Sequence, residues 1–206
     1  IALTHPEVQG VIAGGAGLAD MAANDKNLHF SFSGLVGEGD LNMTELVSIN
    51  NSLDKTQMRH RLIFFDGKHE WAPETAMNIA FAGLQLDAMA NKTTLVDEHF
   101  ISRFTVDSKA RIDAFISGKH YLKAQQECKV SVSFLDGLTD KVTWFKEQEA
   151  QIQMNPAYKK QRQITDDLVA TESQIKEGFM QKFQQPDMNY WTKEIKDVQM
   201  KAKAHT

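Results

Sequence analysis

The chain has 206 residues, of which 42% are hydrophobic and 24% are charged, and its formal net charge is −4 at pH 7. This composition is typical of a folded protein with one large domain or two small ones. The near-balanced charge and the lack of a long run of Lys and Arg argue against a nucleic-acid-binding surface. No stretch of about 20 apolar residues predicts a membrane-spanning helix.

The charge balance changes after Lys92. Residues 1–92 carry 6 basic and 11 acidic residues (−5), whereas residues 93–206 carry 17 and 16 (+1). The change predicts two regions with a boundary at this point. A single cysteine, Cys128, allows no internal disulfide and leaves the compartment undetermined. The N-terminal residues do not resemble a signal peptide, and we expect the chain to begin inside a domain.

The first region is predicted to be an α/β structure with a parallel sheet, because short apolar runs alternate with amphipathic segments. Glycines and polar residues interrupt the apolar runs, which is typical of strands that end in tight loops. Thr44 is the expected N-cap of the first helix, and Trp71 is expected to pack on the first turn of the second. The predicted strands cover 10–16, 28–36 and 61–65, and the predicted helices cover 44–56 and a segment that starts at Pro73.

The second region is predicted to be all-α. Strand-like alternation disappears after Thr93, and long amphipathic segments are separated by Gly or Pro turn signals. Part of it, GKHYLKAQQECKVSVSFLDGL, resembles a tetratricopeptide unit, although no regular repeat period is kept. We therefore expect helical hairpins similar to tetratricopeptide repeats. The predicted helices cover 94–117, 119–136, 139–154, 156–184 and 188–203.

Two loops of the first region carry titratable side chains. Asp40 follows the second predicted strand in the sequence GEGD, and His69 follows the third in DGKHEW. The carboxyl ends of parallel strands meet at one edge of a sheet, so these loops are expected to be neighbours. An acid that orients an imidazole is the core of serine hydrolysis. We predict Asp40 and His69 as this pair, with Glu38 as the alternative acid.

The segments GVIAGGAG, FSGLVGEGDLNMTEL and HRLIFFDGKHEWAP together resemble the C-terminal third of an α/β-hydrolase of the esterase and acyl-peptidase kind. The resemblance covers about residues 1–92. In that family the nucleophilic serine, the acid and the histidine follow one another along the chain. The resemblance implies that His69 is the general base and Asp40 is its partner.

The nucleophile that this resemblance implies is missing, because no G-x-S-x-G motif occurs in the sequence. We expect such a serine to precede Ile1, which makes the chain the C-terminal portion of a serine hydrolase and inactive alone. A completed enzyme would hydrolyse an ester, thioester or peptide bond in a small-molecule or peptide substrate. The alternative is a helical scaffold that binds peptides, with a non-catalytic hydrolase remnant.

Neither a phosphate-binding glycine motif nor a metal-ligand spacing occurs, so no cofactor and no metal are predicted. A protein partner is expected to bind through the helical region. A sheet of only three strands would leave its edges and faces open to association. We therefore expect the helical region, a second copy of the chain or a further segment to complete it.

Overall fold

The computed structural model describes residues 2–17, 28–183 and 188–204. The chain divides into two compact units, residues 1–162 and residues 163–206. The predicted boundary after Lys92 lies within the first unit, between helices α2 (Glu74–Ala90) and α3 (Glu98–Ser117). It marks the change from α/β to all-helical structure.

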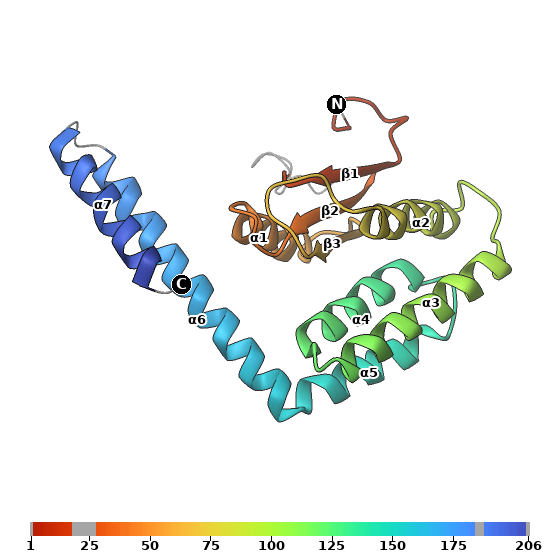
Figure 1. Ribbon diagram of the computed structural model, residues 1–206. Helices are drawn as coiled ribbons and strands as arrows, with labels where there is room; N and C mark the ends of the chain where they lie inside the picture. Colours follow the sequence, from red (N-terminus) through yellow and green to blue (C-terminus); the bar gives the residue numbers. More distant parts are fainter. Residues whose placement is uncertain (1, 18–27, 184–187, 205–206) are drawn as a thin grey trace. The chain divides into compact units, whose positions relative to one another are not determined.

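The first unit contains a three-stranded parallel sheet with the strand order β1 (Gly10–Gly14), β2 (Ser31–Gly37) and β3 (His60–Phe65). Every residue of the central strand β2 is buried. This is typical of a parallel sheet that is covered on both faces, where apolar residues are not restricted to alternate positions. The coarse prediction of a parallel α/β region followed by helices is confirmed (Figure 1).

One helix covers each face of this sheet (Figure 1). On one face, helix α1 (Met43–Leu53) places Leu46 against Val36 of β2 and Leu62 of β3. On the other face, α2 packs Ala76 and Ala80 into the core that contains Leu35 and Ile63. Neighbouring residues of a strand point to opposite faces, so Leu35 and Val36 serve different cores.

Helices α3, α4 (Tyr121–Leu135) and α5 (Val142–Met154) pack against one another and continue the core on the α2 side of the sheet (Figure 1). Helix α4 also covers the outer edge of β3. Gln126 Nε2 donates a hydrogen bond to the carbonyl of Leu62, and Ser133 Oγ donates one to the carbonyl of His60. The helical region therefore satisfies edge carbonyls that would otherwise be open to pairing with another strand.

A buried charge cluster ties the sheet to the helices. Asp87 of α2 is 2% exposed and accepts hydrogen bonds from Arg59 Nε at 2.7 Å and from two nitrogens of Arg61. Arg59 also donates to the carbonyls of Ser133 and Phe134 in α4. Burial lowers the pKa of Arg61, and its bonds to Asp87 oppose this effect. Asp87 thus pairs with two arginines at once, of which only Arg61 is fully buried.

Several predicted boundaries differ from the observed ones. The first strand ends at Gly14 because Gly15 has φ +60° and turns the chain. Helix α1 begins at Met43, so the predicted N-cap Thr44 is wrong: Asn42 occupies that position. Trp71 is 93% exposed, so the prediction that it packs on the next helix is also wrong. It lies in a loop ahead of α2, outside the core.

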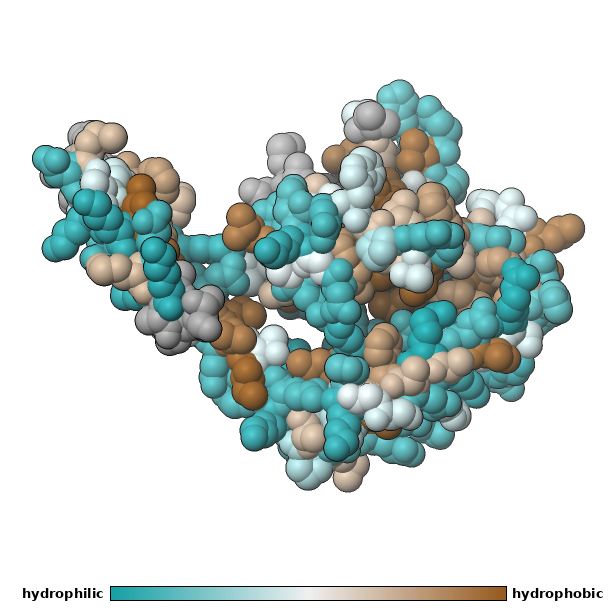
Figure 2. Space-filling view, viewed as in Figure 1, coloured by the Kyte–Doolittle hydropathy of each residue, from teal (hydrophilic) through white to brown (hydrophobic). Residues whose placement is uncertain are grey.

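The second unit consists of the part of helix α6 (Pro156–Lys182) from Gln163 onward and of helix α7 (Met188–Ala204). Trp191 stacks on Phe179 and contacts Phe183, and Lys182 pairs with Glu194. Many large apolar side chains of this unit are more than half exposed, as the brown atoms in Figure 2 illustrate. Examples are Leu168, Ile175, Met180, Met188 and Ile195.

No helix in the described part of the chain is long and apolar enough to cross a membrane.

The close approach of α2 and α4 gives a prediction at Gly83. A Cβ at this position would lie 1.8 Å from Phe134 Cε1, in a fully buried part of the core. Gly83→Ala should therefore lower the free energy of unfolding by about 1–3 kcal/mol, because the clash outweighs the gain in helix propensity. Gly178→Ala in α6 has open space around it and should be neutral or stabilising. Urea unfolding of both variants tests this; equal stabilities would contradict the packing.

The charge cluster gives a second prediction. Asp87→Ala leaves two arginine side chains without their carboxylate, one of them 3% exposed, and should destabilise the first unit by about 3–5 kcal/mol. Asp113→Ala, on the exposed surface of α3, is the control and should change the free energy of unfolding by less than about 0.5 kcal/mol. Thermal unfolding followed by circular dichroism measures both, and a small loss for Asp87→Ala would refute the role of the cluster.

Candidate active site

The candidate site lies where the three strands end. Because the sheet is parallel, the loops after Gly14, Gly37 and Phe65 emerge at the same edge. The loops after β2 and β3 are joined by backbone hydrogen bonds, from Glu38 N to Phe65 O and from Gly39 N to Gly67 O, both at 2.9 Å. The two predicted loops are therefore neighbours, as their strand order required.

Asp40 and His69 meet at this edge. Nδ1 of His69 lies 3.2 Å from each carboxylate oxygen of Asp40. The Asp40 side chain is 2% exposed, whereas the His69 side chain is 65% exposed. Within the described residues, the ring nitrogen Nε2 of His69 makes no hydrogen bond. The buried acid therefore holds one side of the ring and leaves the other side open to solvent.

The chain around Asp40 fixes its carboxylate. The backbone N–H of Asn42 donates a hydrogen bond of 2.8 Å to Asp40 Oδ1, and the Asn42 side chain donates to the carbonyl of Gly15. A Cβ at Gly15 would lie 3.0 Å from the His69 ring and 3.1 Å from Asp40 Oδ2. The first loop thus brings bare backbone against the pair, and only glycine combines its positive φ with that approach.

Glu38, the alternative acid, contacts helix α4 and not His69. Its carboxylate lies 3.3 Å from Nζ of Lys123 in α4, which also binds Asp66 at 2.5 Å. Burial raises the pKa of Glu38, and the positive charge of Lys123 opposes this. Bonding to Lys123 lowers the pKa of Asp66. Of the two predicted acids, the structure therefore brings only Asp40 to the imidazole.

No serine hydroxyl in the described part of the chain forms a hydrogen bond with His69. Ser31 and Ser33 are buried inside β2, and Ser52 of α1 donates to the carbonyl of Ser48. The described residues also contain no group of three His, Cys, Asp or Glu side chains that could hold a metal ion. Among the described residues, the site therefore brings together a carboxylate and an imidazole, but no serine hydroxyl.

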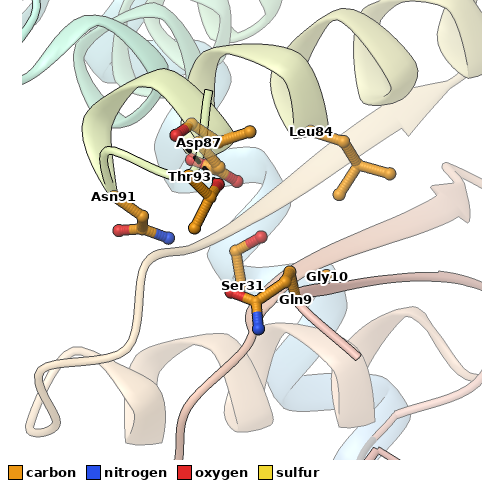
Figure 3. Close-up of a pocket in the computed structure, with 8 residues that line it drawn as sticks. Gln9, Gly10, Ser31, Leu84, Asp87, Asn91 and Thr93 are labelled. Atoms are coloured by element: carbon orange, nitrogen blue, oxygen red, sulfur yellow. Dashed lines mark hydrogen bonds between the residues drawn. The ribbon is translucent and has the colours of Figure 1, made fainter. Parts of the chain in front are cut away.

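A cavity of about 160 Å³ lies at the other end of the strands, below α2 (Figure 3). Gln9 and Ser31 line it from the sheet side, and Leu84 and Asn91 line it from the α2 side. The Ser31 hydroxyl is buried there, and the described residues offer it no hydrogen-bond partner. Since Gly10 and Ser31 begin their strands, this cavity is separate from the pair at the carboxyl ends.

Sequence reasoning missed three contributors to the site: Gly15, Asn42 and Lys123. The positive φ of Gly15 has a sequence signal in the Gly14-Gly15 pair. Asn42 also has a local signal, because it stands two residues after Asp40 and bonds that carboxylate through its backbone, as in an Asx turn. Lys123 is 57 residues from Asp66, so only the tertiary fold reveals it.

Comparison with protein-family models, with curated proteins and with solved structures finds no match for this chain.

Gly15 gives a prediction about the geometry of the pair. In Gly15→Ala the new methyl group must displace His69 or Asp40, and the residue is strained at φ +60° by roughly 1–2 kcal/mol. The hydrogen-bonded Nδ1 proton of His69 should then weaken or disappear from the low-field proton NMR spectrum. Gly14→Ala is the matched control, since nothing lies within 4 Å of its Cβ position. An unchanged signal in Gly15→Ala would show that the described contact is wrong.

Proposed function

We propose that this chain contributes the acid and the base of an α/β-hydrolase-type serine hydrolase. The observation that carries the proposal is the contact of Nδ1 of an exposed imidazole, at 3.2 Å, with a buried carboxylate at the carboxyl edge of a parallel sheet. The chain order of acid before histidine, on loops that follow adjacent strands, supports the same class. So does the covering of the two sheet faces by α1 and α2.

In this proposal, Nε2 of His69 takes the proton of a serine hydroxyl as its oxygen attacks a carbonyl carbon. Asp40 accepts the Nδ1 hydrogen bond, fixes the tautomer and stabilises the imidazolium. His69 then returns the proton to the leaving group, which gives an acyl-enzyme that water hydrolyses by the same route. The exposed Nε2 and the buried Asp40 carboxylate suit these two roles.

The proposal requires a serine and oxyanion-hole donors from a segment outside residues 1–206. The substrate class is an ester, thioester or peptide, and residues 1–206 alone are expected to be inactive. Removing the nucleophile and the oxyanion hole together leaves little transition-state stabilisation. Helices α3 to α5 would then cover one side of the sheet and its outer edge.

A second candidate is a peptide-binding scaffold of tetratricopeptide-like hairpins. The observation that favours it is the set of exposed apolar side chains on α6 and α7, among them Leu168, Met180 and Ile195. Helical hairpins can present such side chains to a peptide. A scaffold would need neither His69 nor Asp40, which separates the two candidates experimentally.

The test uses the gene sequence upstream of the codon for Ile1 and the protein that it encodes together with residues 1–206. A G-x-S-x-G motif is expected there. The longer protein should react with a fluorophosphonate probe and hydrolyse nitrophenyl esters, and His69→Ala should lower kcat by about 10⁴-fold, because the base is lost.

His99→Ala is the matched control, since His99 is exposed on α3 and should leave the rate unchanged. Asp40→Asn should reduce the rate to a similar extent as His69→Ala, because the imidazole loses its orienting acid. Full activity of His69→Ala, or an upstream sequence without a nucleophile, would reject the hydrolase and favour the scaffold.

A further inference from the structure

Lys123 stands out among the charged groups outside the acid and base pair, because it bridges the two loops of the site. It lies near the start of α4 and contacts Glu38, the first residue after β2, at 3.3 Å. It also contacts Asp66, the first residue after β3, at 2.5 Å. Asp40 follows Glu38 by two residues, and His69 follows Asp66 by three. One side chain of the helical region thus joins the first residues of both loops.

The loops are packed tightly at this point. A Cβ at Gly37, the last residue of β2, would lie 2.4 Å from the carbonyl oxygen of Lys68. The loop of His69 therefore touches the backbone at the start of the Asp40 loop without an intervening side chain. The backbone N–H of Lys68 in turn donates to Glu70 Oε1 at 3.0 Å, which closes the histidine loop on itself. A change in the spacing of the two loops is therefore passed directly to Asp40 and His69.

Without Lys123, two carboxylates would face each other. Glu38 and Asp66 both contact the same ammonium group, so their carboxylates lie close together. Single exposed ion pairs contribute only about 0.2–1 kcal/mol, and Asp66 is 82% exposed, so the bridge adds little to overall stability. Its effect is local, because loss of the lysine replaces two attractions by one repulsion between the loops.

We propose that Lys123 is a positioning residue, which holds the loop of Asp40 and the loop of His69 at the spacing where the acid orients the imidazole. The catalytic purpose of this spacing rests on the proposed function. The position of the two loops does not depend on that function. In this proposal helix α4, which belongs to the second predicted region, sets the geometry of the Asp40 and His69 pair in the first predicted region.

The test measures solvent exchange of the His69 Nδ1 proton by NMR in residues 1–206. Lys123→Met should speed this exchange by about fivefold or more, because repulsion between the two carboxylates opens the loops. Lys123→Arg should behave like the wild type, since it keeps the charge. Lys129→Met, on the exposed side of the same helix, is the matched control and should have no effect.

The double variant Lys123→Met with Glu38→Gln separates positioning from a general loss of structure. It removes the repulsion without restoring the lysine, so exchange should return toward the wild-type rate. All variants should unfold at nearly the wild-type temperature. A wild-type rate in Lys123→Met, failure of the double variant to recover, or a wild-type ring with no Nδ1 bond to Asp40 would each overturn the proposal.

The outcome is independent of the hydrolase assay. If Lys123→Met changes the exchange rate but His69→Ala leaves the longer protein fully active, the positioning role stands and the hydrolase is rejected. If Lys123→Met leaves exchange unchanged while His69→Ala abolishes activity, the hydrolase stands and the positioning role is rejected.

Discussion

The parallel pairing of three adjacent strands is the constraint on which the site depends. In a parallel sheet every strand ends at the same edge, so loops that are about 25 to 30 residues apart in the chain become neighbours. Gly15, Asp40 and His69 each come from a different strand, and no local interaction could bring them together. The register, with Gly37 beside Phe65, places the acid loop and the histidine loop side by side.

The strands, the helices and the loop positions of Asp40 and His69 could be predicted from the sequence, because apolar runs and glycine turns are local signals. Asp40 was also preferred over Glu38 from the sequence, but the contact that Glu38 makes instead could not be predicted. Glu38 contacts Lys123 of α4, which lies far along the chain, so no local signal reveals this pair. Trp71 was placed wrongly for a related reason: an aromatic residue beside a helix start predicts packing only if a surface is there to receive it.

The buried cluster of Asp87, Arg59 and Arg61 explains why the change in composition after Lys92 does not separate two compact units. Asp87 is the last acidic residue before the predicted boundary. It pairs with Arg61 of β3 and with Arg59, the residue that precedes β3. Arg59 also binds carbonyls of α4, beyond the predicted boundary. Breaking the chain's first unit at that point would expose these charges and the Gly83–Phe134 contact.

Two carboxylates of one short loop thus have different partners. Asp40 lies within the loop, bonded by Asn42 N–H and His69, and is nearly inaccessible to solvent. Glu38 reaches the helical region instead. Helix α4 also donates hydrogen bonds to carbonyls of β3. It therefore contacts both the outer edge of the last strand and the first residues of the two loops. The helical region is therefore part of the framework that determines where the acid and the imidazole meet.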